Sequence, residues 1–188
     1  MSHRSLRLIP ARLIPALLAV VAYAAEFDYK VLATRKTSTL EKEMNEFAGQ
    51  GYVFSSVMGG STAGGNEGVV VMVKAARANR KYKLLAANKT STMDRELKQA
   101  GNEGFEYKGQ SVFQSSFGDR EVVVILERDA SAPARKIAYR LLATSRTSTM
   151  EKELNQVGAD GFRLLGLTVA QTAFGGSELL CILDKPGE

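Results

Sequence analysis

One stretch of sequence occurs three times in the chain in similar form, and this repetition constrains the fold more than any other feature. The stretches "TSTLEKEMNEFAGQGY", "TSTMDRELKQAGNEGF" and "TSTMEKELNQVGADGF" begin at Thr37, Thr90 and Thr147, so the copies start 53 and then 57 residues apart. The longer second spacing is accounted for by the linker "DASAPARK" at residues 129–136, whose Ala, Ser and Pro are typical of a surface connection. A period of this length indicates tandem copies of one small structural unit.

Each copy has the pattern of a strand, a helix and two further strands. Apolar and polar residues alternate in "YKVLAT", "YKLLAA" and "YRLLAT", which predicts half-buried strands at residues 29–34, 82–87 and 139–144. The final strands "VVVMV", "VVVIL" and "LLCIL" are apolar without alternation, which predicts burial on both faces. The helix between them has one apolar stripe that should face a core. The stripe consists of Leu40, Met44 and Phe47, then Met93, Leu97 and Ala100, then Met150, Leu154 and Val157.

The ends of each helix and the following hairpin also carry signals. A serine is expected to cap each helix start through its hydroxyl, and an acidic residue three positions later completes a capping box where it is Glu. A glycine after the last turn suits a left-handed residue that ends the helix. Gly followed by Asn, Asp or Gly predicts a two-residue hairpin turn. These residues are Ser38, Ser91 and Ser148; Glu41, Asp94 and Glu151; Gly51, Gly104 and Gly161; and Gly65-Asn66, Gly118-Asp119 and Gly175-Gly176.

The size of one copy bears on how the copies are arranged. A unit of about fifty residues buries too little surface to be stable alone, and its helix covers only one face of its sheet. We therefore expect an α+β fold in which three tandem βαββ units, at residues 25–76, 80–129 and 136–186, pack as one compact pseudo-threefold unit. Separate units on a string, with their open sheet faces covered by oligomerisation, are the alternative.

The first 24 residues have the layout of a secretory signal peptide. Basic residues precede an apolar stretch at residues 13–22, and "AYA" ending at Ala24 supplies a small-x-small cleavage site. The apolar stretch is too short to span a bilayer and Pro15 interrupts it, although a retained anchor is the competing interpretation. We expect a bacterial protein cleaved after Ala24, without a transmembrane span, in the periplasm or the medium.

Composition excludes several kinds of chemistry. Cleavage would remove three of the 25 basic residues and leave 22 against 20 acidic ones, so no nucleic-acid partner is expected. It would also remove His3, the single histidine, which excludes Ser-His-Asp and Cys-His catalysis and His-containing zinc sites. Cys181 is the single cysteine and lies in "LLCIL", where a buried thiol is expected. We assign no catalytic residue, metal or cofactor.

A resemblance emerges from the stretch that begins at Leu154, "LNQVGADGFRLLGL". It resembles the Leu-Asn-x-x-Gly-x-x-Gly-Trp-Glu signature of a small bacterial domain family of unknown function. The aromatic position is Tyr or Phe in every copy, since the chain contains no Trp. The resemblance implies a small α+β fold and brings no activity. It is carried by Asn45, Gly51 and Tyr52; by Leu97, Gly101, Gly104, Phe105 and Glu106; and by Leu154, Asn155, Gly158, Gly161 and Phe162.

A basic residue stands two positions before each serine, where a cation opposes the helix dipole and therefore needs a reason. With the hydroxyls and free amides of a helix start, it would suit a phosphate or a carboxylate. Alternatively, it only solubilises the loop. The candidate anion-binding residues are Lys36, Ser38 and Thr39; Lys89, Ser91 and Thr92; and Arg146, Ser148 and Thr149.

These observations favour an exported, non-catalytic interaction or binding module, which binds another protein or assembles with itself. A small-anion or nucleotide binder that uses the helix starts is the first alternative. A hydrolase based on carboxylates is the second.

Overall fold

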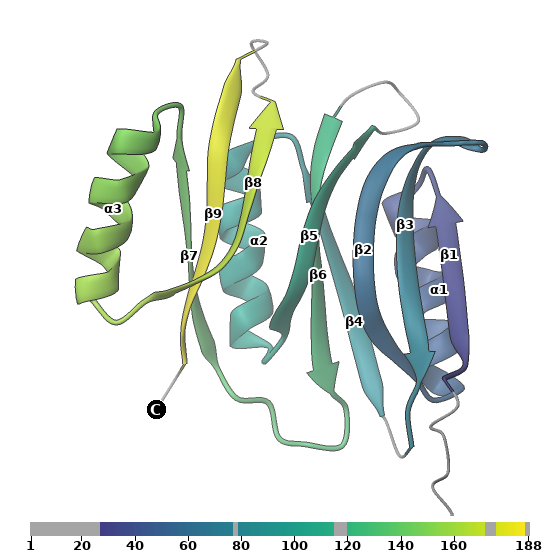
Figure 1. Ribbon diagram of the computed structural model, residues 1–188. Helices are drawn as coiled ribbons and strands as arrows, with labels where there is room; N and C mark the ends of the chain where they lie inside the picture. The colour runs from purple at the N-terminus through teal and green to yellow at the C-terminus, as the bar shows by residue number, and fades with distance from the viewer. Residues whose placement is uncertain (1–26, 77–78, 115–119, 172–175, 187–188) are drawn as a thin grey trace, which may run out of the picture.

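The computed structural model describes residues 27–76, 79–114, 120–171 and 176–186 (Figure 1). Within them the chain forms three similar units, each with a three-stranded antiparallel sheet and one helix, so the predicted α+β class and βαββ repeat are confirmed. The predicted signal peptide at residues 1–24 lies outside the described residues. No helix in the described part of the chain is long and apolar enough to cross a membrane.

In each unit the last strand lies between the other two, with sheet orders β1-β3-β2, β4-β6-β5 and β7-β9-β8. The first strand of every unit is therefore an edge strand. Unit 1 contains β1 (Tyr29–Thr34), α1 (Thr37–Gly49), β2 (Tyr52–Thr62) and β3 (Gly65–Lys74). Unit 2 contains β4 (Arg80–Ala87), α2 (Thr90–Asn102), β5 (Glu106–Gln114) and β6 (Arg120–Asp129). Unit 3 contains β7 (Ile137–Thr144), α3 (Thr147–Ala159), β8 (Arg163–Gln171) and β9 (Ser177–Pro186).

The three units stand in a row, with unit 1 and unit 3 at opposite ends and unit 2 between them (Figure 1). Helix α1 packs on its own sheet and on β4 of the next unit, and α2 packs likewise on its own sheet and on β7. The expected pseudo-threefold arrangement is therefore not found. The reason is that each junction joins the helix side of one unit to the open sheet face of the next, a head-to-tail relation that does not close over three units.

Each of the two larger hydrophobic cores spans a junction between units. The first joins Leu40, Met44, Val70 and Met72 to Tyr82, Leu84, Val123 and Ile125. The second joins Met93, Leu97, Val124 and Leu126 to Ile137, Tyr139, Leu180 and Ile182.

The final strands of units 2 and 3 are buried on both faces, as predicted. Val124 and Ile125, neighbours in β6, are both 0 % exposed, because one packs with α2 and the other with unit 1. In β3, Val70 is buried but Val71 is only half-buried, because no other unit of the described chain covers this face.

The predicted glycine ends of the helices are confirmed, but the predicted serine caps are wrong. Gly51, Gly104 and Gly161 have φ of 86°, 80° and 86°. The helices begin one residue before the serines, and the extended Lys36, Lys89 and Arg146 take the cap position without any side-chain cap. In unit 1 the Thr34 hydroxyl accepts the Lys36 backbone N–H at 3.2 Å. Of the capping-box acids, Glu41 reaches into the next unit and accepts the Leu84 N–H at 2.7 Å.

The first hairpin turn also differs from the prediction. Thr62 pairs with Gly65, so Ala63 and Gly64 form the turn, and Gly65 belongs to β3. Gly118, Asp119 and Gly175 lie outside the described residues, so the other two turns stay predictions. The hairpin of unit 1 is one residue shorter than the others, since Tyr29 pairs with Val73 where Tyr82 pairs with Glu127 and Tyr139 with Asp184.

The expected burial of Cys181 is confirmed. It is 1 % exposed and packs under α3, with its Sγ 3.3 Å from the Met150 Sδ. Burial raises the pKa of this thiol above its ordinary value, and the charge of Glu153 adds to the shift. A protonated, enclosed thiol is a packing group rather than a nucleophile.

Candidate functional site

At the first junction, one amide side chain of α1 binds the backbone of the edge strand β4. Asn45 of α1 donates to the Tyr82 carbonyl at 3.0 Å and accepts from the Tyr82 backbone N–H at 2.9 Å. Alternate residues of an antiparallel edge strand turn their backbone groups away from the sheet, where they need another partner. Asn45 and Glu41 supply that partner to Tyr82 and Leu84. Helix α1 thus replaces the neighbouring strand that β4 lacks.

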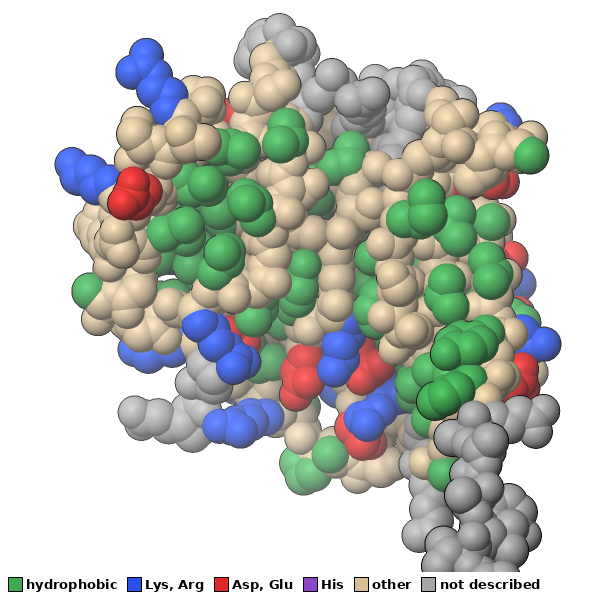
Figure 2. Space-filling model, viewed as in Figure 1, with side chains coloured by type: hydrophobic (Ala, Val, Ile, Leu, Met, Phe, Trp, Pro, Cys, Tyr) green, Lys and Arg blue, Asp and Glu red, His purple; other side chains and the backbone are tan. Residues whose placement is uncertain are grey.

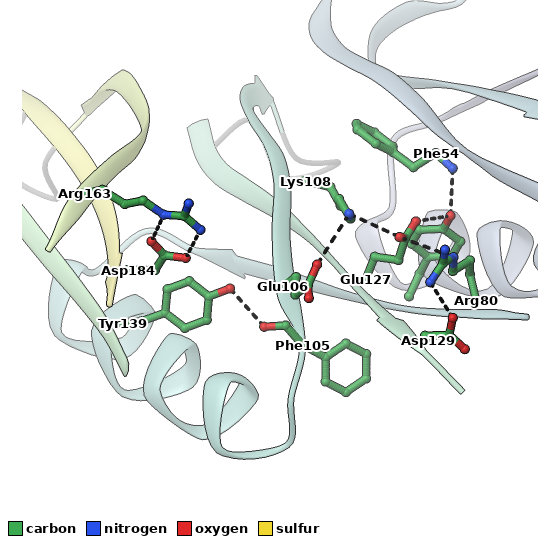
Figure 3. A network of polar contacts seen from close by, with 11 residues as sticks. Phe54, Arg80, Phe105, Glu106, Lys108, Glu127, Asp129, Tyr139, Arg163 and Asp184 are labelled. Atoms are coloured by element: carbon green, nitrogen blue, oxygen red, sulfur yellow. Dashed lines mark hydrogen bonds and ion pairs between the residues drawn. The ribbon is translucent and has the colours of Figure 1, made fainter. Parts of the chain in front are cut away.

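The Tyr82 side chain also takes part in a polar network at the same junction, between Phe54 and Glu127. Figure 3 shows these two residues with Arg80, Lys108 and Asp129 around them. The Tyr82 hydroxyl accepts from the Phe54 N–H and donates to the Glu127 carboxylate, both at 2.7 Å. Burial raises the pKa of Tyr82 well above its ordinary 10, and the hydrogen bond to Glu127 raises it further. Glu127 is 7 % exposed, and Lys108 at 3.3 Å and Arg80 at 3.6 Å compensate its charge. The network therefore holds two units together with its charges balanced.

The second junction is also held by a buried tyrosine and a buried carboxylate, but through different contacts. The Tyr139 hydroxyl donates to the Phe105 carbonyl at 2.9 Å, and burial raises the pKa of Tyr139. Asp184, which corresponds to Glu127, is 6 % exposed and accepts from the Arg163 guanidinium at 2.6 and 3.1 Å (Figure 3).

Helix α2 has no counterpart of Asn45, because Lys98 stands there and pairs with Asp94 at 2.6 Å. It approaches β7 closely instead. A Cβ on Gly101 would overlap the Ile137 carbonyl oxygen.

A pocket of about 450 Å³ opens at the second junction. Its Asp184 carboxylate is already held by Arg163, and burial raises the pKa of its Tyr107 to about 12. The described residues contain no cluster of His, Cys, Asp and Glu that could hold a metal. The pocket thus presents ion pairs and a neutral phenol rather than a nucleophile with an adjacent base, and the hydrolase alternative stays untested. Its lining residues are Glu106, Tyr107, Arg135, Ile137, Arg163, Leu165 and Asp184.

The helix starts, where an anion site is predicted, lie along the upper edge of Figure 1, one on each unit. They belong to units in a row and do not converge on an axis. Lys36, Lys89 and Arg146 are exposed, and the serine hydroxyls are not used as caps. At the second start, however, the Thr90 hydroxyl lies 3.3 Å from the Glu178 carboxylate, which would repel an anion. The anion site stays a prediction, and a phosphate titration followed by thermal unfolding would test it.

Exposed apolar side chains identify two surfaces that sequence reasoning missed. Among the described residues, the exposed large hydrophobic side chains lie only on the terminal units. We define the head face as the face of the β1-β3-β2 sheet turned away from α1, and the tail face as the outer side of α3 and β8. Figure 2 shows apolar side chains gathered over unit 1 on the right and over unit 3 on the left. They are Phe27, Tyr29, Val31 and Met58 on the head face, and Leu164, Leu167 and Val169 on the tail face, with exposures of 48–66 %.

The two surfaces are the free ends of the packing that joins the units. Tyr29 corresponds to Tyr82 and Tyr139, which are 1 % and 3 % exposed because a preceding unit covers them, whereas Tyr29 is 53 % exposed. The signal for the head face was present in the apolar run of β3, which predicts burial on both faces.

Comparison of the chain with protein-family models, with curated proteins and with solved structures finds no match. The resemblance to the small bacterial domain family therefore stays a prediction.

Proposed function

We propose that the protein is an exported, non-catalytic repeat module that binds protein surfaces through its head and tail faces. The observation that carries the proposal is the gathering of exposed apolar side chains on these two faces. Single exposed apolar residues are ordinary, but contiguous patches mark interaction sites. The head face adds the edge strand β1, whose outward backbone groups can accept a partner.

Site-specific photo-crosslinking tests this function in the cells that produce the protein. A photo-reactive residue at Val31 or Leu167 should give covalent protein adducts, because both side chains lie within the exposed patches. The matched control is Lys42, whose side chain is 77 % exposed on α1. Adducts no more abundant at Val31 and Leu167 than at Lys42 would reject the proposal.

Export is the second part of the proposal and rests on the signal-peptide pattern of residues 1–24. The intact mass of the protein recovered from the periplasm or the medium should correspond to a chain that begins at Ala25. A cell-associated product that retains residues 1–24 would contradict it.

A further inference from the structure

We propose that the partner of the head face is the tail face of a second copy, so that the protein assembles head to tail by repeating its own internal junction. This inference rests on the proposed function and names the partner. Inside the chain, the helix side of one unit twice covers the open sheet face of the next unit. The tail face is the third such helix side, and the head face is the first such sheet face.

The polar contacts of the first junction have counterparts at both ends. Glu151 and Asn155 occupy the positions on α3 that Glu41 and Asn45 occupy on α1, and both are exposed. On the other side, Tyr29 and Val31 correspond to Tyr82 and Leu84.

The backbone of β1 is oriented to bind the Glu151 and Asn155 side chains of another copy. The Asp28 carbonyl accepts from the Lys74 N–H at 2.8 Å, so residues 28, 30 and 32 pair with β3. By alternation, the backbone groups of Tyr29 and Val31 point away from the sheet. Asn155 of one copy can therefore pair with Tyr29 of the next, and Glu151 can accept the Val31 N–H.

The apolar contacts of the internal junctions also continue at the ends. The second strand of each unit, β2, β5 or β8, carries a bulge at the same place. The residue before the bulge packs on the bulge of the next unit. Phe54 lies over Gly109 and Tyr107 lies over Gly166, where a Cβ would meet these rings. At the ends, the corresponding residues are Leu164 and Ser56. In the proposed contact the smaller Leu164 would replace the aromatic ring, and the larger Ser56 would replace the glycine beneath it. The combined volume of the two side chains thus stays similar.

Two further features favour this contact, one by leaving space and the other by avoiding a buried charge. Gly158 corresponds to Gly101, the close-approach glycine of α2, and a Cβ on Gly158 would meet nothing within 4 Å. On the head face, Val73 stands where Glu127 and Asp184 stand in the other units. Covering the head face therefore buries no carboxylate at that position, and no compensating cation is needed there.

The relation between the faces is heterologous, so it can generate longer assemblies or a ring rather than a twofold dimer. Purified full chain, expressed with its own N-terminal segment, should show a mass that rises with concentration in sedimentation velocity and light scattering. Val31→Glu on the head face and Leu167→Glu on the tail face should each be monomeric. Mixed in equal amounts, they should form a one-to-one dimer, because each retains the face that the other has lost.

The control variant Asn88→Glu adds the same charge at an exposed site in unit 2 and should assemble like the parent. Circular dichroism and thermal unfolding of dilute samples verify that the variants fold. Should Leu167→Glu unfold, Val169→Glu replaces it, because Val169 lies on the same face and is more exposed, at 55 % against 51 %.

A parent that stays monomeric at all concentrations overturns the proposal, and so does self-association of either single variant, which would mean a symmetric contact. A monomeric parent whose Val31 and Leu167 positions still crosslink to other proteins would leave the proposed function standing and reject only the second copy as partner.

Discussion

One amide side chain, Asn45, satisfies both backbone groups of Tyr82 on an edge strand. A backbone N–H or C=O that is buried without a partner costs about 1–3 kcal/mol. The corresponding Asn155 is exposed on α3 and has no unit beside it within the described chain. The same residue type at equivalent helix positions is thus structural at one place and available for a partner at the other.

Asn45→Ala should lower the free energy of unfolding by about 1–3 kcal/mol, because Tyr82 loses both partners. Asn155→Ala should change it by less than about 0.5 kcal/mol in dilute solution, as expected for an exposed site. Urea unfolding of the two variants and the parent measures both values. Equal losses would mean that the contact with Tyr82 does not stabilise the junction.

The buried tyrosines make stability depend on alkaline pH. Burial raises the pKa of Tyr107 to about 12, above its ordinary 10, so the unfolded chain loses this proton first as pH rises. The contribution of Tyr107 is complete below pH 10 and is lost between pH 10 and about 12, with a slope of at most about 1.4 kcal/mol per pH unit. Tyr107→Phe should therefore lose stability less steeply over this interval in urea unfolding. A slope identical to that of the parent would show that Tyr107 ionises freely in the folded protein.

Among the elements, the sequence signals were reliable where one residue type meets one steric demand. Glycine adopts the left-handed conformation after a helix at little steric cost, and Gly51, Gly104 and Gly161 stand at these positions. The helix start was misplaced because Thr37, Ser38 and Thr39 can all cap by residue type, whereas the extended Lys36 takes the cap position without a side-chain cap. The hairpin turn was misplaced because Gly64 and Gly65 both permit a turn, and strand register decides between them.

Two glycines at equivalent positions in α2 and α3 test how closely these helices are approached. A Cβ on Gly101 would overlap the Ile137 carbonyl and the Tyr139 ring, whereas a Cβ on Gly158 would meet nothing. Gly101→Ala should cost about 1–3 kcal/mol through overpacking. Gly158→Ala should stabilise by about 0.5–1 kcal/mol through helix propensity, measured by urea unfolding in dilute solution. Destabilisation by Gly158→Ala would mean that the α3 surface is covered.

For the whole molecule, three similar units and their need for one another followed from the repeat and from the doubly apolar final strands. Their order in space did not follow, because the apolar run of β6 is the same whether its second face meets a preceding unit in a row or a neighbour around an axis. The residues that decide the order of the units, Asn45 and Gly101, contact backbone groups of the next unit. Such backbone groups leave no pattern in sequence. The end faces were missed because the apolar run of β3 resembles that of β6, and only the order of the units decides which run stays uncovered.

Because both large cores cross a junction, the units should not unfold independently. The exception is α3, whose core contains only Val157, Cys181 and Leu183 as buried residues. On α3, Met150 and Leu154 are half-buried, although the equivalent Leu40 and Met44 are 0 % exposed. Local opening free energy follows the buried apolar contact of a segment, so α3 should open before the rest.

Native-state hydrogen exchange in low urea, in dilute solution, should therefore show α3 losing protection first, while β3, β6 and β9 exchange together in a later, global step. The test separates one cooperative array from units on a string, in which each unit would lose protection at its own urea concentration. If head-to-tail assembly covers the tail face, raising the protein concentration should selectively slow exchange in α3 and in the edge strand β1. Equal slowing in α2 would point to a general effect of concentration rather than to contact between the end faces.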